Sequence, residues 1–401
     1  MGESPRTVAI IAGQLVLGGA ERQLYLWLSH LDRRRFRPVV ATLHPGCGDY
    51  WEPAIEALDV PLLRIPRRKN RLARLLDLTR RLRPYRPEIV HGWHLFASPY
   101  AGAAGKLLGA RASLGSLRGS FDAYREQRSE AVLTERLVDG FVVNSRPAAD
   151  RLAASGRARG KKIYALPNAV EDRVEEKALA RRRWTEEWGV PPGRFWIGSV
   201  GRLDPGKRFD LLLELVSLLA RRGEDVHAVV VGDGPALARL KERARELGVL
   251  DRTTFPGADP GVRESISALD LFCFPSPDEG LPNVVMEAAA GGVPILAWRT
   301  PFLEELLEPG FSAAVADFGD LDGWEREATR FLRDPERGRR MGEAGRQRIL
   351  EGFGVSQFVE RLTEIYDERI GPGQRGALPA TTGIREPEES STDSRREAAA
   401  S

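Results

Sequence analysis

The sequence predicts an α/β protein with two doubly wound, Rossmann-like domains that face each other across a cleft. Short apolar runs alternate with longer amphipathic stretches along the chain, a pattern typical of parallel strands covered by helices. The pattern restarts near Trp196, and 401 residues are enough for two domains with separate cores. Sheets of this kind bind ligands beyond the carboxyl ends of their strands.

In the first half, five apolar runs indicate strands, and amphipathic stretches indicate the helices between them. The strand candidates are rich in β-branched residues, whereas the helix candidates repeat their apolar residues every three to four positions. The expected strands are 7–12, 37–43, 62–65, 89–91 and 141–144. The expected helices are 21–31, 72–82 and 97–108.

The second half repeats the arrangement after a connecting segment, 167–192, which is charged and helix-prone. Five further apolar runs predict the strands of a second sheet, and three amphipathic stretches predict helices. The expected strands are 196–200, 228–231, 253–255, 271–274 and 295–297. The expected helices are 209–221, 235–247 and 283–290.

These patterns predict four segments along the chain. We expect an N-terminal Rossmann-like domain over residues 1–170 and a C-terminal one over 171–354. An amphipathic stretch predicts a terminal helix within 355–371. The remainder, 372–401, is rich in Gly, Pro, Ser, Thr and charge, with almost no large apolar residues, so we expect it to be disordered.

The segment from Leu271 to Ala288 carries the most specific functional signal. An apolar strand ends at Phe274, a turn-rich loop follows, and a helix opens near Pro282. Glu279 lies in the loop and Glu287 lies eight residues later, inside the helix. Amides at a helix N-terminus favour an anion, and carboxylates suit hydroxyl groups, so the segment fits a sugar linked to a phosphate. The alternative reading is an acidic surface loop before an ordinary helix.

This segment resembles the E-x7-E signature of retaining glycosyltransferases with the GT-B fold, in the large bacterial glycosyltransferase family 4. The resemblance extends over about residues 5–370 and implies that the terminal helix returns to the N-terminal domain. It implies that Glu279 lies by the donor sugar and that Glu287 binds the ribose hydroxyls. The expected donor-binding residues are Gly201, Gly280, Leu281, Pro282, Asn283 and Glu287.

A second loop, Gly201 to Arg208, follows the first strand of the C-terminal half and holds two cations across a Pro-Gly turn. It matches the family's phosphate-binding pair, here Arg202 and Lys207. A leaving diphosphate gains charge as the glycosidic bond breaks, so positioned cations stabilise the transition state more than the ground state. The resemblance therefore implies catalytic roles for Arg202, Lys207 and Glu279. The alternative is a basic surface loop.

The N-terminal half offers further cleft candidates at its strand ends. Gly18, Gly19 and Glu21 belong to a Gly-Gly-Ala-Glu-Arg motif, which one branch of the family shares and which opens the first helix. Many family members place a catalytic histidine near the strand end at 91–96; we favour His94, with His91 as the alternative. Arg118 ends the segment Gly115 to Arg118, and we expect it to face the same cleft.

Composition and charge indicate which binding partners and which cellular compartment to expect. Two cysteines, Cys47 and Cys273, form no disulfide framework or zinc site, and no apolar run is long enough to span a membrane, so we expect a cytoplasmic protein. Residues 1–170 carry a net charge of +13 and the rest −10. Because the excess gathers in the basic stretch 64–86, we expect contact with the anionic inner face of the cell membrane. This stretch lacks interleaved aromatic residues, so we expect no nucleic-acid partner.

The sequence as a whole predicts a hexosyltransferase of cell-surface polysaccharide or glycolipid synthesis. By resemblance, it moves a hexose from a nucleotide-diphosphate sugar, UDP- or GDP-linked, to a sugar or lipid-linked acceptor with retention of configuration. We expect no cofactor and no metal, since the Arg202–Lys207 loop supplies the cations. Two alternatives stay open: a nucleotide-sugar epimerase of GT-B fold, and a noncatalytic partner of a glycosyltransferase complex.

Overall fold

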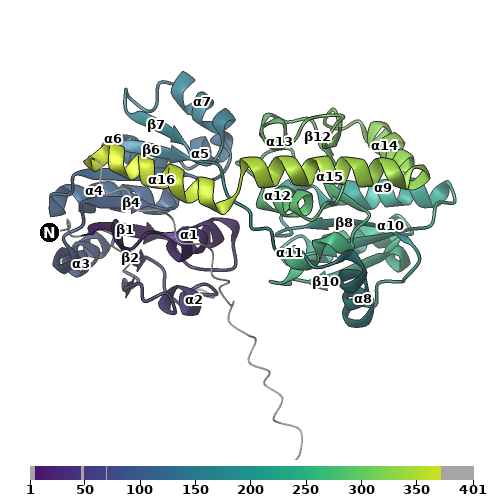
Figure 1. The fold of residues 1–401 in the computed structure, drawn as a ribbon, viewed down its shortest axis with the longest axis horizontal. Helices are drawn as coiled ribbons and strands as arrows, with labels where there is room; N and C mark the ends of the chain where they lie inside the picture. Colours follow the sequence, from purple (N-terminus) through teal and green to yellow (C-terminus); the bar gives the residue numbers. More distant parts are fainter. Residues whose placement is uncertain (1–4, 47–48, 69, 372–401) are drawn as a thin grey trace, which may run out of the picture.

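The computed structural model describes residues 5–46, 49–68 and 70–371, which form two α/β domains side by side (Figure 1). All paired strands run parallel, in a seven-stranded sheet of order β3-β2-β1-β4-β5-β6-β7 and a six-stranded sheet of order β10-β9-β8-β11-β12-β13. The predicted architecture of two doubly wound domains is confirmed. The predicted disordered tail, 372–401, lies outside the described residues.

The first sheet forms because its central strands are apolar on both faces and covered by helices. Val8 to Ala12 are fully buried in β1. The strands are β1 (Arg6–Ala12), β2 (Phe36–Thr42), β3 (Leu62–Arg64), β4 (Ile89–Gly92), β5 (Ala112–Leu117), β6 (Gly140–Val143) and β7 (Lys162–Ala165). The helices of four or more residues are α1 (Gly19–His30), α2 (Glu52–Glu56), α3 (Arg71–Leu82), α4 (Ser98–Leu108), α5 (Phe121–Glu126), α6 (Arg128–Leu137) and α7 (Arg146–Ala154).

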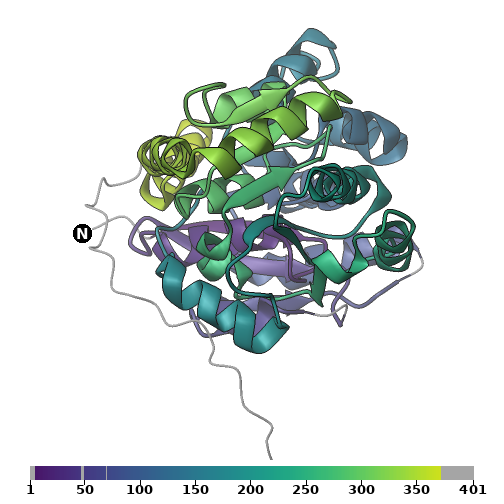
Figure 2. The same cartoon turned by 90° about the vertical axis from the view of Figure 1, so that its right-hand side faces the viewer.

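The second sheet repeats this construction, and α8 precedes its first strand. Figure 2 shows helices on both sides of the sheet. Its strands are β8 (Phe195–Val200), β9 (Val226–Val231), β10 (Thr253–Gly257), β11 (Leu271–Phe274), β12 (Ile295–Trp298) and β13 (Ala314–Ala316). The helices are α8 (Lys177–Trp188), α9 (Phe209–Arg221), α10 (Leu237–Glu246), α11 (Val262–Ser265), α12 (Asn283–Ala290), α13 (Pro301–Leu306), α14 (Leu321–Arg333) and α15 (Pro335–Gly352).

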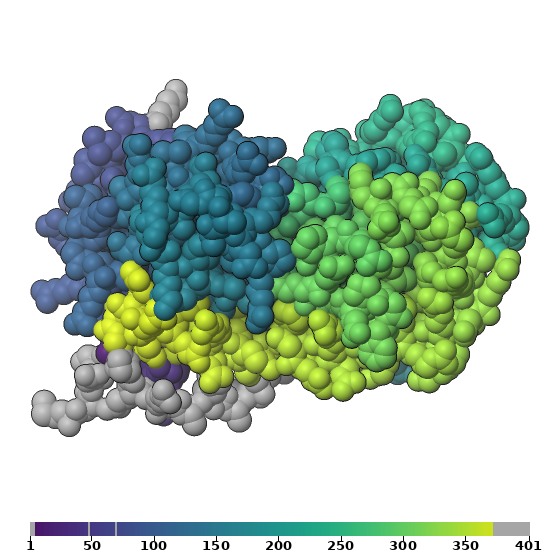
Figure 3. Space-filling view, turned by 90° about the horizontal axis from the view of Figure 1, so that it is seen from above, coloured from purple at the N-terminus to yellow at the C-terminus, as the bar shows by residue number. Residues whose placement is uncertain are grey.

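The chain passes between the domains twice, and the two passages lie side by side. The first runs through Val170, whose amide donates to the Phe353 carbonyl of the second at 2.9 Å. The terminal helix α16 (Val355–Ile370) then packs against α1 of the first domain. Figure 3 shows this yellow helix along the first domain and the green α15 along the second. Tyr366 of α16 is fully buried, and its hydroxyl forms a 2.8 Å hydrogen bond with Nδ1 of His91 in β4.

Both sheets reverse their strand order beside their first strand, between β1 and β4 and between β8 and β11. At such a switch point the two following loops separate to opposite faces and leave room for a ligand. The loops after β1, β4, β8 and β11 carry most of the residues that the sequence singled out. The fold therefore positions these loops at the facing edges of the two domains.

Candidate functional site at the domain interface

Lys207 and Glu279 meet at the switch point of the second sheet. Lys207 follows β8 and Glu279 follows β11, and the Lys207 ammonium contacts the Glu279 carboxylate in an ion pair. Ser276 Oγ donates to the same Glu279 oxygen at 2.9 Å. The Lys207 side chain is 34% exposed and the Glu279 side chain 17%, so water reaches the pair. A ligand phosphate that reached Lys207 would compete with this carboxylate.

Arg202 lies in the same loop as Lys207, but its guanidinium points to Asp204 and not to Glu279. Its side chain is 73% exposed and pairs with Asp204 at 3.0 Å. Gly201 before it has a φ of +153°, and a Cβ at Gly232 would lie 1.9 Å from the Gly201 carbonyl oxygen. The Gly-Asp-Gly-Pro turn that begins at Gly232 therefore supports this loop through close backbone packing. The structure does not bring Arg202 into contact with Lys207 or Glu279.

Glu287, the second glutamate of the pair, is held by an arginine of the first domain. Arg22 in α1 donates through Nη1 to Glu287 Oε1 at 2.6 Å and through Nη2 to Glu171 Oε2 at 3.1 Å. All three side chains are at most 13% exposed. Sequence reasoning missed Arg22, although it directly follows Glu21 in the motif that was singled out. The Glu287 carboxylate is thus already neutralised across the domain interface.

The backbone of the two domains comes close at the glycines of both motifs. A Cβ at Gly19 would lie 2.2 Å from Asn283 Nδ2, and one at Gly280 would lie 2.9 Å from the Gly119 carbonyl oxygen. Asn168 bridges the same region, since its Nδ2 donates to Leu281 O at 3.1 Å and to Asn283 Oδ1 at 2.9 Å. The Gly-Gly-Ala-Glu-Arg motif and the loop around Gly280 to Asn283 therefore form two sides of one interface. A Cβ at Gly18 would instead collide with the Glu21 side chain.

His94 and His91 have different environments, which separates the two candidates. His94 Nδ1 accepts from the Gly13 amide at 3.2 Å, and its Nε2 lies 3.2 Å from Glu21 Oε1. Its side chain is 21% exposed. His91 is fully buried, with its two ring nitrogens 2.8 Å from Tyr366 OH and from Ser116 Oγ. Burial lowers the pKa of His91 well below its usual range. His94 is therefore the more exposed of the two histidines, although its Nε2 atom is buried.

Arg118 is a half-buried cation of the first domain. Its guanidinium carbon lies 3.8 Å above the Trp93 ring, and its Nη1 makes a long, 3.5 Å contact with Asn168 Oδ1. Nε and Nη2 are buried and have no hydrogen-bond partner among the described residues. Burial lowers the pKa of Arg118 to about 9, while Tyr366 and Glu21 oppose that shift. Stacking on Trp93 and the nearby Glu21 charge keep this cation in place.

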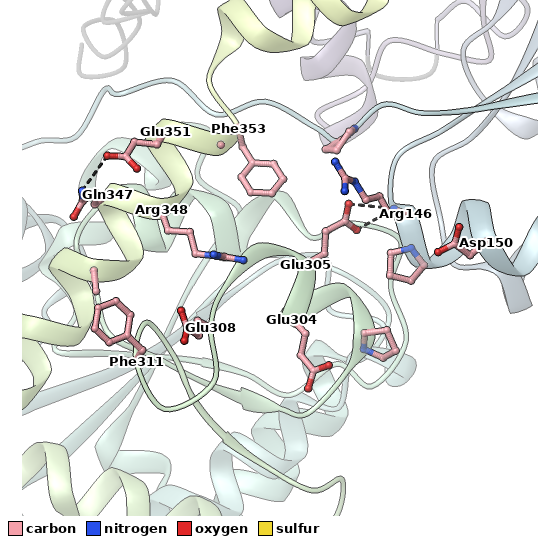
Figure 4. A pocket seen from close by; sticks show the side chains of 15 residues that line it. Arg146, Asp150, Glu304, Glu305, Glu308, Phe311, Gln347, Arg348, Glu351 and Phe353 are labelled. Atoms are coloured by element: carbon pink, nitrogen blue, oxygen red, sulfur yellow. Dashed lines mark hydrogen bonds between the residues drawn. The ribbon is translucent and has the colours of Figure 1, made fainter.

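A cavity of about 850 Å³ lies apart from these residues, between α7, α13 and α15 (Figure 4). The Arg146 amide at the start of α7 donates to the Glu305 carboxylate at 3.0 and 3.1 Å across its wall. Burial raises the pKa of Glu305. Glu304, Arg348 and Phe353 also line the cavity, but none of the predicted donor-binding or catalytic residues does. It is a groove beside the two interdomain passages.

The described residues contain neither a metal-binding cluster nor a membrane-spanning helix. In the described part of the chain, no three His, Cys, Asp or Glu side chains gather in a way that could hold a metal ion. Among the described helices, none is both long and apolar enough to cross a membrane.

Two family models match consecutive parts of the chain. The model described as Glycosyl transferases group 1 matches residues 180–348, which contain β8 to α14 and both glutamates of the E-x7-E segment. The model described as Glycosyltransferase Family 4 matches residues 17–174, from the Gly-Gly-Ala-Glu-Arg motif to the first interdomain passage. The chain belongs to the group 1 glycosyltransferases of GT-B fold. It is thus a transferase.

Relatives of this glycosyltransferase agree with that assignment. It is 27% identical over 375 residues to a GDP-mannose-dependent alpha-(1-6)-phosphatidylinositol monomannoside mannosyltransferase of Mycolicibacterium smegmatis, covering 88% of this chain and 95% of the relative. It is 30% identical to a 2-deoxystreptamine glucosyltransferase of Streptomyces kanamyceticus over 59% of this chain and 62% of the relative. The second alignment thus spans less than two thirds of that relative.

A solved structure shares the fold at low sequence identity. HepE of Anabaena, solved in complex with UDP and glucose, superposes with a TM-score of 0.79 and 17% identity, covering 90% of this chain and 100% of that chain. At this identity the likeness establishes the GT-B arrangement of the glycosyltransferase and nothing about its ligands.

Proposed function

We propose that this glycosyltransferase moves a hexose from a nucleotide-diphosphate sugar to a sugar or lipid-linked acceptor, with retention of configuration and without a metal. The observation that carries the proposal is the Lys207–Glu279 ion pair at the second sheet's switch point. It places a cation for phosphate and a carboxylate for sugar hydroxyls side by side. The names of relatives support donors of this class, since one is GDP-mannose-dependent and HepE was solved with UDP.

In the proposed reaction, Lys207 binds the diphosphate as it leaves. The ammonium is neutralised by Glu279 when no phosphate is present, and an arriving diphosphate takes over that cation. Glu279 is then free to face the sugar, while Arg202 turns from Asp204 toward the phosphate. Because charge accumulates on the diphosphate during bond cleavage, Lys207 stabilises the transition state more than the bound substrate.

Glu287 has a proposed role in binding the ribose hydroxyls. The Glu287 carboxylate forms an ion pair with Arg22, so the ribose must share this carboxylate with Arg22 or displace it. Arg22 has Glu171 as a second partner, and its charge would stay paired if the ribose displaced it from Glu287. Exchange of partners therefore avoids the cost of an unpaired buried cation.

Retention follows if the acceptor hydroxyl attacks on the face from which the diphosphate departs. The bond from the anomeric carbon to the phosphate oxygen breaks, the bond to the acceptor oxygen forms, and the leaving phosphate oxygen takes the acceptor's proton. The cations of the Arg202–Lys207 loop support the departing charge in the role that a divalent metal has elsewhere. In the proposed reaction His94, whose Nε2 lies 3.2 Å from Glu21 Oε1, contacts the sugar from the opposite domain.

The test is transfer from UDP- and GDP-hexoses to a panel of sugar and lipid-linked acceptors, with the product's anomeric configuration read by NMR. Lys207→Ala should lower turnover by about 10²–10³ with nearly unchanged donor affinity. Lys241→Ala, an exposed lysine of α10, is the matched control and should leave turnover unchanged. Conversion of the donor without any acceptor would instead indicate an epimerase. Absence of both reactions would favour a noncatalytic partner.

We also propose that the protein is cytoplasmic and that α3 contacts the inner face of the cell membrane. Leu72 and Leu76 are 61% and 57% exposed and lie one turn apart on the same helix face. The same helix carries Arg71, Arg74, Arg80 and Arg81, and amphipathic basic helices of this type lie in membrane interfaces. Leu72→Ser with Leu76→Ser should weaken sedimentation with phosphatidylglycerol vesicles; unchanged sedimentation would contradict the proposal.

A further inference from the structure

A cluster of one cation and three aromatic side chains lies at the same sheet edge as His94. We call His44, Arg74, Phe96 and Tyr100 the Arg74 cluster. His44 follows β2, Phe96 follows β4, and Arg74 belongs to the first turns of α3, so all come to the carboxyl edge of the first sheet.

Arg74 is held in a fixed position without a carboxylate. Its Nη1 lies 3.3 Å from His44 Nε2, and its Nη2 donates to the Arg68 carbonyl oxygen at 2.6 Å. The guanidinium carbon lies 6.0 Å and 5.9 Å from the ring centroids of Phe96 and Tyr100. Within residues 5–46, 49–68 and 70–371, no Asp or Glu oxygen forms an ion pair with Arg74. Its Nε and the buried Tyr100 hydroxyl lack hydrogen-bond partners in the same residues.

Three neighbouring arginines are more exposed to water than Arg74, and each of them pairs with a carboxylate. Arg64 pairs with Glu52 and Glu56, Arg68 with Asp77 at 2.9 Å, and Arg71 with Glu130 at 2.8 Å. A solvent-exposed cation needs no partner, whereas a half-buried one among aromatic rings loses hydration and favours an anion. The chain therefore pairs Arg64, Arg68 and Arg71 with carboxylates and leaves Arg74, beside the aromatic rings, without one.

His44 accepts from Arg74 and therefore adds no positive charge in the unliganded protein. Burial, together with the charges of Arg74 and Arg67, lowers the pKa of His44. An anion placed against Arg74 would offset the repulsion that these two arginines impose. The His44 ring lies tilted against the Phe96 ring, with their centroids 4.8 Å apart. This contact fixes one wall of the site.

The Arg74 cluster is joined to His94 through one residue. The His44 amide donates to the Gly13 carbonyl at 2.8 Å, and the Gly13 amide donates to His94 Nδ1 at 3.2 Å. A Cβ at Gly13 would lie 4.0 Å from Phe96 and 3.9 Å from His94. The cluster is thus adjacent to the proposed sugar-transfer site, on the domain opposite the Lys207–Glu279 pair.

We propose that the Arg74 cluster binds an anionic group, a phosphate or carboxylate, carried by the acceptor. The inference rests on the proposed function, because it assigns the donor to the second domain and leaves the first domain's edge for the acceptor. The planar guanidinium suits an oxyanion with two oxygens, and the aromatic rings exclude water from the contact. The unpartnered Tyr100 hydroxyl supplies a further donor.

The test is calorimetric titration with glycerol 3-phosphate and with glycerol, in the presence of saturating nucleotide so that the donor phosphate site is filled. Glycerol 3-phosphate should bind and glycerol should not. Arg74→Gln should weaken that binding by about tenfold or more, the range for a charge-assisted hydrogen bond. Arg111→Gln, an arginine at the opposite sheet edge that pairs with Glu88, should leave it within about twofold, as expected for an exposed pair.

Each outcome separates this inference from the proposed function. Nucleotide binding with glycerol 3-phosphate binding unchanged in Arg74→Gln would overturn the inference alone, whereas absence of nucleotide binding would overturn the proposed function. Should Arg74→Gln not fold, Tyr100→Phe and Arg74→Lys together test the site, and binding unchanged in both would overturn the inference. Competition by phosphatidic acid vesicles, but not by phosphatidylcholine vesicles, would identify a lipid-borne phosphate; competition by neither would identify a free one.

Discussion

Arg22 of the first domain donates to Glu287 of the second at 2.6 Å, across 265 positions of sequence. The contact joins the Gly-Gly-Ala-Glu-Arg motif to the E-x7-E segment, so the two most specific motifs of the chain are physically linked. Both side chains are nearly buried, and Glu171 completes the group. Domain contact and the proposed ribose site therefore depend on the same carboxylate.

Removal of the Arg22 cation should destabilise the protein. Arg22→Met leaves Glu287 without its partner and leaves Glu171 with Arg173 alone, at 3.4 Å. Breaking a buried pair in this way costs about 3–5 kcal/mol. Urea denaturation followed by fluorescence measures the change. Arg34→Met is the matched control, since Arg34 is 71% exposed beside Asp32 and should change the free energy of unfolding by less than about 1 kcal/mol. Equal effects of the two substitutions would contradict a structural role for the Arg22 pair.

A side chain at Gly280 should disturb the approach of the domains. A Cβ there would lie 2.9 Å from the Gly119 carbonyl and 2.8 Å from Asn144 Oδ1, so Gly280→Ala should cost about 1–3 kcal/mol and weaken donor binding. Gly352→Ala is the control, because nothing lies within 4 Å of its Cβ position. Thermal unfolding and nucleotide titration measure both effects. A Gly280→Ala protein with unchanged melting temperature and donor affinity would contradict this close approach of the two domains.

The two candidate histidines should respond differently to substitution. His94→Ala should lower turnover by about 10²-fold and leave the melting temperature nearly unchanged, as expected for a positioned group at a reaction site. His91→Ala should lower the melting temperature, because Tyr366 and Ser116 would each lose a buried hydrogen bond. Turnover at low temperature and differential scanning calorimetry separate the two effects. A reversed pattern would move the catalytic assignment to His91.

Stability should fall on mild acidification through His227 in β9. Burial, assisted by Arg194, lowers its pKa to about 4 from 6.5, so the unfolded chain binds a proton before the folded one does. The free energy of unfolding should therefore decrease as the pH falls from about 6.5 to 4, by roughly 2–3 kcal/mol. His227→Asn should show a smaller decrease between pH 7 and pH 4.5 in urea titrations. The same decrease in both proteins would assign the acid sensitivity to other groups.

Most of the fold could be predicted from apolar pattern alone, because buried parallel strands are continuous apolar runs. Helices 209–221 and 283–290 and strand 271–274 match the structure residue for residue. The strands β5, β7 and β13 were missed for physical reasons. β13 has only three residues, Ala-Val-Ala, which is too short a run to indicate a strand. β5 has the sequence Ala-Ser-Leu-Gly-Ser-Leu, whose small polar residues carry no strand signal, and β7 is an edge strand that begins with the exposed Lys162.

The candidate site was predictable residue by residue but not as an arrangement. The sequence identified Lys207 and Glu279 separately, and their contact depends on the order of β8 and β11 in the sheet. Arg22 was overlooked because its partners lie in segments far along the chain, and no local pattern signals such a pair. The orientation of Arg202 toward Asp204 is likewise a matter of side-chain geometry, which spacing in the sequence does not determine.

The most direct test of the proposed donor site is calorimetric titration of the protein with UDP, GDP, ADP and dTDP, with and without EDTA. We expect one nucleotide to bind at micromolar strength, unaffected by EDTA, and to lose at least about tenfold in affinity in Glu287→Ala. Glu246→Ala, an exposed glutamate of α10, should bind as the unchanged protein does. Binding of none of the four, or binding that is equal in Glu287→Ala, would contradict the proposed donor site.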